Sequence, residues 1–320
     1  MDYSKLKKNL FISLVIGIVV FAGLSIYSDA NSLIEVFAGF DYRYLPFILI
    51  LAPLNYLFRF VKWSYYLHLI DAKVDKKESF YIFISGLCMT VTPGKVGEFF
   101  KSYLLKDRAG IPVSSTAPLV MGERLTDGIS MLILASLGTI AFNYGKAALV
   151  LVLIGMVGFV AVVQSPSLVH RLLWRLEKIP FLTRFGKAME NFYDKTYIIF
   201  QLKPLLFAIG IGTVSWFFEG LVIYLTVKAM GIELSLLASV FVVSFSTIVG
   251  AVSMMPGGLF AAEGSIVGLL VMMDLPKDVA VATTIITRFS TLWLGVGIGL
   301  LGLVKIGLMS RCKIEKTRYE

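Results

Sequence analysis

The sequence predicts an all-α polytopic membrane protein, an inverted repeat of transmembrane helices with two re-entrant or broken-helix hairpins. Of its 320 residues 57% are hydrophobic and 16% charged, and the mean hydropathy is +0.82. Soluble domains carry about a quarter charged residues, so this composition is typical of membrane proteins. The chain also holds long apolar stretches and two Pro-Gly breaks, at Pro93 and Pro256, and each break is followed by an arginine within an apolar stretch.

Six apolar stretches are long enough to cross a hydrocarbon core of about 30 Å as helices that rise about 1.5 Å per residue. We expect these full spans at residues 9–27, 45–70, 112–142, 147–164, 203–229 and 279–304. The first is longer than the apolar region of a signal peptide, so we interpret it as an uncleaved span.

The segments beside each Pro-Gly break differ from full spans. Residues 79–92 are too short to cross, and 94–106 carries charged side chains that cannot face lipid. We therefore expect a re-entrant hairpin, which is tolerated at depth only where protein or water surrounds it. The later pair, 235–254 and 258–273, is more apolar, and we expect it either to re-enter or to cross fully before it returns to its starting side.

The distribution of Lys and Arg places both termini in the cytoplasm of a cell-membrane protein. With the N-terminus inside, the basic segments all fall on the cytoplasmic side: 1–8, 71–78, 101–108, 171–203 and 305–318. The external segments contain Arg43, Lys146, Lys228 and Lys277. The net charge of +9 is then explained by the anionic cytoplasmic leaflet, and no nucleic-acid partner is expected.

Five parts follow from these segments. They are an N-terminal span and external loop (1–44), a first repeat (45–142), a connecting span with cytoplasmic interfacial helices (143–202), a second, inverted repeat (203–305) and a basic cytoplasmic tail (306–320). The interfacial helices are predicted from an apolar stripe that includes Leu168 and Leu172, with Arg171 and Arg175 opposite.

The repeat is predicted from spacing and direction. Arg124 lies 31 residues after Pro93, and Arg288 lies 32 after Pro256. Because hairpins add no net crossing, span 45–70 and its counterpart in the second unit, span 203–229, run in opposite directions. Inverted repeats with broken helices are typical of alternating-access transporters, whose site lies near the midplane between the halves.

Charged residues recur at the predicted membrane depth. Each costs about 2.5–3.5 kcal/mol at a helix centre, so together they must pair or line a hydrated cavity. Polar positions three and four apart define shared helix faces, as in Asn55, Arg59, Lys62 and Tyr66. We predict that the substrate-binding residues are Arg59, Lys62, Lys95, Glu98, Arg124, Asp127, Glu219, Glu263 and Arg288, with turns at Pro93, Gly94, Pro256, Gly257 and Gly258.

Structural roles are the alternative for these residues. Lys95 and Glu98 are spaced to pair with each other, and Glu98 and Glu263 would complement helix dipoles. Five of the ten charged residues at this depth are basic and five acidic once Glu123 is included, so net charge does not select an anionic ligand. Helices that begin near the two breaks, with their unsatisfied N–H groups, and forked donors from Arg124 favour an anion.

We expect neither a metal site nor a catalytic centre. The two cysteines and two histidines form no cluster. The glycines from Gly297 to Gly302 match a dinucleotide fingerprint, but they lie inside a span with no preceding strand, so close helix packing is the better interpretation. No nucleophilic triad and no Asp-rich metal motif is present in the sequence, and we expect neither a cofactor nor an enzyme.

Four motifs resemble the lysylphosphatidylglycerol synthase transmembrane (flippase-like) family, which includes the membrane half of the multiple peptide resistance factor. They are Thr92-Pro-Gly-Lys-Val-Gly-Glu98, Glu123-Arg-Leu-Thr-Asp127, Pro256-Gly-Gly-Leu-Phe-Ala-Ala-Glu263 and Thr287-Arg288. The resemblance covers residues 9–305. It implies a membrane protein that moves a lipid headgroup between leaflets, with Glu98, Arg124, Asp127, Glu263 and Arg288 in its central site.

Our expectation is therefore a flippase for a phospholipid or a polyprenyl-phosphate-linked headgroup. The alternatives are an integral glycosyl- or phosphotransferase that acts on a lipid phosphate, and a small-anion transporter. The sequence ends after the last span without a soluble acyltransferase domain, so we do not expect aminoacyl-lipid synthesis. The identity of the lipid, the direction of transport, its energy source and the oligomeric state stay open.

Overall fold

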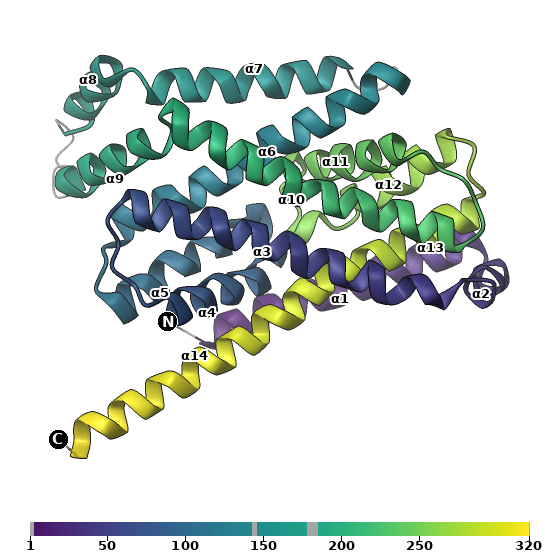
Figure 1. The fold of residues 1–320 in the computed structure, drawn as a ribbon, viewed down its shortest axis with the longest axis horizontal. Helices are drawn as coiled ribbons and strands as arrows, with labels where there is room; N and C mark the ends of the chain where they lie inside the picture. The colour runs from purple at the N-terminus through teal and green to yellow at the C-terminus, as the bar shows by residue number, and fades with distance from the viewer. Residues whose placement is uncertain (1–2, 143–145, 178–184, 320) are drawn as a thin grey trace.

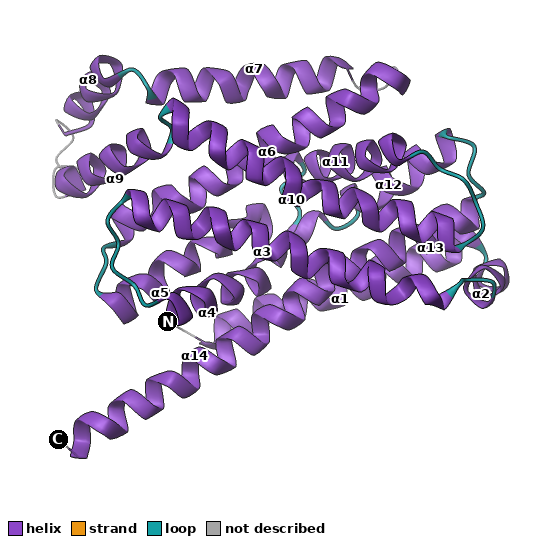
Figure 2. Ribbon diagram, viewed as in Figure 1, coloured by secondary structure: helices purple, strands orange, loops and turns teal. Residues whose placement is uncertain are grey.

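The computed structural model describes residues 3–142, 146–177 and 185–319. Within these ranges every regular element is a helix, loops join the helices, and there is no strand (Figures 1 and 2). The predicted all-α class is thus confirmed. The long helices lie side by side in a layered bundle, and α14 extends beyond it toward the C-terminus (Figure 1).

Helices coincide with each predicted segment. The N-terminal part contains α1 (Tyr3–Ser28) and α2 (Ala30–Ala38), and the first half contains α3 (Leu45–Leu69), α4 (Lys76–Leu87), α5 (Phe100–Ala109) and α6 (Val113–Phe142). The connecting part contains α7 (Lys146–Val163), α8 (Pro166–Glu177) and α9 (Gly186–Ile199). The second half contains α10 (Leu202–Ala229), α11 (Leu236–Val252), α12 (Ala261–Met272), α13 (Lys277–Arg288) and α14 (Leu294–Tyr319).

Three segments are long and apolar enough to cross a membrane unaided: Tyr42–Leu69, Leu202–Ala229 and Lys277–Met309. A fourth is reached if α1 and α2, which meet at an angle of 94°, count as one span. Helix α6 has the length of a span at 30 residues, but Glu123, Arg124 and Asp127 lie in it. Six full crossings stay a prediction.

The two hairpins enter the bundle from opposite ends and meet inside it. Helices α4 and α5 are joined at the Pro93 break by short 3-10 turns, Cys88–Val91 and Pro93–Phe99, and α11 and α12 are joined by the turn Pro256–Gly258. These turns contact each other. Helix α11 begins and α12 ends at the same end of the layer (Figure 1), as expected of a hairpin, and whether this hairpin re-enters or crosses fully stays open.

Packing between the halves is reciprocal. Helix α4 of the first hairpin packs on α14, α11 of the second hairpin packs on α6, and α3 packs on its counterpart α10. A two-fold arrangement of inverted units would produce this pattern of contacts. The internal repeat itself stays a prediction.

The connecting helices α8 and α9 differ in how they meet the bundle. Helix α9 packs on α6, and Asn191 Nδ2 donates hydrogen bonds to the hydroxyls of Ser114 and Ser115 at distances of 2.9 and 2.7 Å. Helix α8 exposes Leu168 and Trp174. The side chains of Leu172, Leu173 and Leu176, on which the apolar stripe depends, lie outside the described residues, so interfacial placement stays a prediction.

Glycines let α14 approach the first hairpin closely. A Cβ at Gly299 would lie 2.3 Å from the backbone nitrogen of Cys88, and one at Gly302 would lie 2.7 Å from the side chain of Ile84. A Cβ at Gly297, in contrast, would meet nothing within 4 Å. Gly299 and Gly302 therefore serve helix packing, as predicted, whereas Gly297 does not.

Gly299→Ala is expected to lower the free energy of unfolding by about 1–3 kcal/mol, because overpacking at a backbone contact forces α14 and α4 apart. Gly297→Ala is the matched control, and it is expected to leave stability unchanged or slightly higher because alanine favours the helix. Thermal unfolding of the detergent-solubilised variants measures both. Equal melting temperatures for the two variants would contradict the packing contact.

Candidate functional site

The two Pro-Gly turns are hydrogen bonded to each other. Gly94 N donates to Met254 O at 3.2 Å. Gly94 and Gly257 have φ angles of 58° and 62°, a left-handed conformation that glycine adopts without strain. Met254, which is not glycine, also has a positive φ of 56°. The structure thus places Pro93, Gly94, Pro256, Gly257 and Gly258 in two turns that form one contact inside the bundle.

Helical structure begins at both prolines, as expected, but the α-helices begin several residues later. Helix α5 begins at Phe100 and α12 at Ala261, because 3-10 turns occupy the residues after both prolines. Gly97 N donates to Thr92 Oγ1, and Gly258 N donates to Met255 O. Protein acceptors satisfy these two N–H groups, and the arginines near the turns are the other candidate anion ligands.

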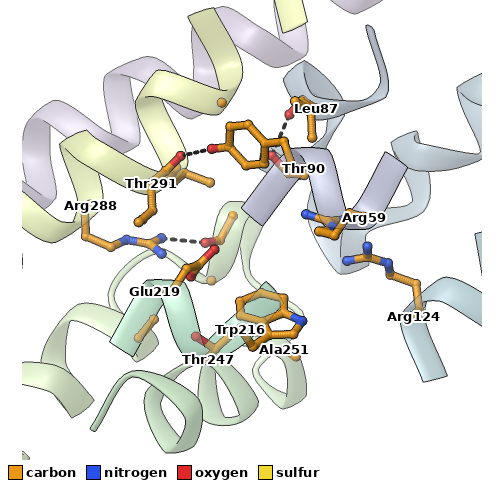
Figure 3. A pocket seen from close by; sticks show the side chains of 17 residues that line it. Arg59, Leu87, Thr90, Arg124, Trp216, Glu219, Thr247, Ala251, Arg288 and Thr291 are labelled. Atoms are coloured by element: carbon orange, nitrogen blue, oxygen red, sulfur yellow. Dashed lines mark hydrogen bonds between the residues drawn. The ribbon is translucent and has the colours of Figure 1, made fainter. Parts of the chain in front are cut away.

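A cavity lies between the hairpin turns and the middle of the long helices (Figure 3). Its volume is about 80 Å³, space for several water-sized molecules. The charged side chains that line it are Arg59 from α3, Arg124 from α6, Glu219 from α10 and Arg288 from α13. Figure 3 shows Arg59 and Arg124 on one side and Arg288 on the other, with Glu219 and Trp216 between them.

The three arginines differ in how far the protein satisfies them. Arg288 donates from Nε to Glu263 at 2.6 Å and from Nη2 to the carbonyl of Gly257 at 2.7 Å. Arg124 reaches Asp127 at 3.0 Å. Arg59 is 95% buried, since only 5% of its surface is exposed, yet among the described residues its guanidinium donates no hydrogen bond and reaches Asp127 only at 3.8 Å.

The same arginine–glutamate contact occurs in both halves. Arg124 Nε lies 3.2 Å from Glu98 Oε2, and Arg288 pairs with Glu263. In each half the glutamate follows the Pro-Gly break. The arginine lies further along the chain, in α6 in the first half and in α13 in the second. Glu98 and Glu263 are buried, so each carboxylate holds its arginine at the cavity wall.

Asp127 is the centre of a buried charge cluster. Its carboxylate pairs with Lys62 and with Arg124, and Arg59 lies slightly farther away. Lys62 is fully buried and does not line the cavity. Lys62 and Asp127 therefore lie outside the cavity lining, where Asp127 pairs with the arginines, whereas Arg59 and Arg124 line the cavity.

Two other predicted residues are placed differently. Glu219 faces the cavity, and Asn55 Nδ2 lies 3.4 Å from its Oε1. The side chain of Lys95 lies outside the described residues, so its predicted pairing with Glu98 stays untested. Glu98 contacts Arg124.

Sequence reasoning placed Thr291 on one polar helix face with Arg288, but it missed other neutral residues of the cavity, among them Tyr56 and Trp216. Tyr56 donates its hydroxyl hydrogen bond to the carbonyl of Thr291, which lies in the π-helical turn Phe289–Trp293 after Arg288. Such turns are frequent at functional sites. The spacing offered a signal, since Tyr56 and Trp216 each precede a charged cavity residue by three positions.

Another buried ion pair, which the sequence analysis did not predict, lies outside the cavity. Lys101 pairs with Glu123, and its ammonium lies 4.6 Å from the ring centroid of Trp63. Both charged side chains are almost fully buried. Neither lines the cavity, so we assign the pair a structural role in joining α5 to α6.

Removing one partner of this pair is expected to cost about 3–5 kcal/mol of stability, because the other charge stays buried without compensation. Lys101→Met and Glu123→Leu should each destabilise the protein strongly, while the double variant should lose much less than the sum. A double-mutant cycle by thermal unfolding measures this coupling. Additive effects would contradict the pairing.

The fold and the site define a polytopic α-helical membrane protein with a charged cavity between two broken hairpins. Residues 14–299 match the family described as the lysylphosphatidylglycerol synthase TM region, and the chain belongs to this family. The resemblance found in the four motifs is thereby confirmed.

Relatives of this chain are described as membrane proteins. It is 22% identical to a UPF0104 membrane protein of Methanothermobacter thermautotrophicus, over 92% of this chain and 95% of the relative. It is also 22% identical to a UPF0104 membrane protein of Methanocaldococcus jannaschii, over 72% of this chain and 97% of the relative. These descriptions name no substrate.

Proposed function

We propose that this protein is a lipid translocase that moves a phosphate-bearing headgroup, of a phospholipid or a polyprenyl-phosphate-linked lipid, between leaflets. The observation that carries the proposal is the convergence of Arg59, Arg124 and Arg288 on one cavity beside two broken hairpins. Guanidinium groups suit phosphate because they present several donors in a planar fork.

The burial of Arg59 is the strongest support for an anionic ligand. A buried charge without a hydrogen-bonded partner is unfavourable, and Asp127 already pairs with Lys62 and Arg124. A phosphate in the cavity would accept hydrogen bonds from Arg59 and from the free face of Arg124. Glu219, the acidic member of the lining, would meet a cationic part of the headgroup.

Translocation requires the halves to move. A cavity of about 80 Å³ does not hold a whole headgroup, so the site must widen toward one leaflet and then the other, as in alternating access. The hairpin contact between Gly94 and Met254 lies between the halves and would open in this motion. A coupling ion at one of the buried carboxylates, or movement without coupling, would complete the cycle.

The proposed location is the cytoplasmic membrane, with both termini inside. Basic segments would contact the anionic lipids of the cytoplasmic leaflet. The family supports a lipid-related membrane role, and we propose transport rather than synthesis because the cavity presents arginines without a nucleophilic triad among the described residues.

Reconstituted vesicles test the proposal directly. We expect the purified protein to accelerate exchange of labelled phosphatidylglycerol or labelled polyprenyl phosphate between leaflets, and not of a labelled glycosyldiacylglycerol, which has a polar headgroup but no phosphate. Accessibility of the label to a membrane-impermeant quencher measures the exchange. Equal rates for lipids with and without phosphate would contradict the assigned role of the arginines.

The same preparation separates the alternative functions. Uptake of radiolabelled inorganic phosphate into sealed vesicles, without lipid exchange, would identify a small-anion transporter. Formation of a modified lipid from a polyprenyl phosphate and a sugar-nucleotide donor would identify a transferase. Either result would replace the translocase proposal.

A further inference from the structure

The tip of the second hairpin separates the cavity from the outer surface of the bundle by a thin wall. Gly250, Ala251, Gly257 and Gly258 line the cavity. The backbones on the two sides of the tip nearly touch, since a Cβ at Gly258 would lie 3.2 Å from the Cα of Gly250. No large side chain of these four residues fills the wall, in contrast to Trp216 elsewhere in the lining.

The outer side of this wall is apolar and exposed. We define the hairpin-tip window by its four exposed side chains: Val252, Met254, Met255 and Phe260, with exposures of 67%, 63%, 37% and 48%. Because the two hairpins enter from opposite ends and meet, this surface lies at the depth of the membrane interior. Exposed apolar side chains at this depth are suited to contact with hydrocarbon.

Non-helical backbone rarely faces lipid, because unsatisfied polar groups are costly there. The tip meets this requirement internally. Met254 N donates to Ala251 O, Met255 N donates to the hydroxyl of Ser253, and Gly94 N donates to Met254 O. The window can thus present apolar side chains to hydrocarbon while its backbone remains hydrogen bonded.

We infer that the hairpin-tip window is the lateral portal through which the hydrocarbon chains of the transported lipid extend while its headgroup occupies the cavity. The inference rests on the proposed function. It follows from continuity, because the same short turn lines the arginine cavity on one side and presents apolar side chains to the membrane on the other. A charged headgroup and its tails need such a junction, since the tails cannot enter a polar cavity.

Reversible blockade of the portal tests this inference. Val252, whose side chain belongs to the window, is 67% exposed and does not line the cavity, is replaced by cysteine, and a bulky methanethiosulfonate reagent is attached after the protein is folded and reconstituted. We expect exchange of labelled phosphatidylglycerol or polyprenyl phosphate to fall to the rate of protein-free vesicles and to recover when the disulfide is reduced. Recovery excludes misfolding as the cause.

Two controls accompany the test. Leu151→Cys places the same reagent on α7 at a side chain that is 74% exposed, and it should leave transport unchanged. The unsubstituted protein, treated in the same way, controls for the native cysteines Cys88, which is buried, and Cys312, and its transport should also be unchanged. Transport that persists after complete labelling of Val252→Cys, or an equal loss at Leu151→Cys, would overturn the portal. Absence of lipid exchange by the unlabelled proteins would instead overturn the proposed function.

Discussion

Arg59→Gln is expected to weaken binding of a phosphate-bearing lipid by about 10- to 150-fold, which corresponds to the roughly 1.5–3 kcal/mol of a hydrogen bond to a charged group. Arg59 is suited to this role because it is buried against the cavity and donates no hydrogen bond to another described residue. Lipid exchange at subsaturating substrate should fall by a similar factor in reconstituted vesicles.

The substitution should leave the fold largely intact, which makes it a clean test. Asp127 keeps Lys62 and Arg124 as partners when Arg59 is lost, so this carboxylate stays compensated. Arg43→Gln is the matched control, because it removes an arginine whose side chain is 90% exposed and far from the cavity. Exchange that is equally slow in both variants would contradict the role of Arg59, as would unchanged exchange in Arg59→Gln.

Asp127→Asn is expected to be the most destabilising single substitution of the site. It would leave Lys62, which is fully buried, without its anionic partner, and loss of one partner of a buried pair costs about 3–5 kcal/mol. Arg59 and Arg124 would lose the same counterion. Thermal unfolding should show a large decrease in melting temperature, together with lower yield of folded protein.

A second substitution distinguishes charge imbalance from lost packing. Lys62→Met in the Asp127→Asn background removes the uncompensated ammonium, so the double variant should regain part of the stability. If the double variant is less stable than Asp127→Asn, the cluster is not organised around the Lys62–Asp127 pair. Asp41→Asn, at an exposed ion pair, should have no measurable effect.

Much of the fold was predictable because Pro-Gly breaks in an apolar sequence indicate where helices are interrupted. Pro93 and Pro256 each interrupt an apolar stretch, and the stretch before Pro93 is too short to cross, so hairpins were predictable from local chemistry. Arg124 and Arg288 were predictable for a similar reason, since a charge in an apolar helix needs a partner. The reciprocal packing of the hairpins on the opposite halves depends on tertiary contacts that no local pattern records.

The finer geometry of the site could not be predicted in the same way. The 3-10 turns after both breaks depend on hydrogen bonds such as Gly97 to Thr92 and Gly94 to Met254, and the second of these joins residues distant in the chain. Equally, periodicity places Arg59 and Lys62 on one helix face but does not tell which of them reaches the cavity. That distinction depends on Asp127, which lies in another helix.

Lipid retained by the purified protein tests the central claim most directly. Native mass spectrometry of the full chain, extracted gently from membranes, should show a phosphate-bearing lipid bound to the unsubstituted protein and to Arg43→Gln, and its loss from Arg59→Gln. Retention of the same lipid by Arg59→Gln, or no enrichment of phosphate-bearing lipids above their proportion in the membrane, would contradict a lipid-phosphate site in the arginine cavity.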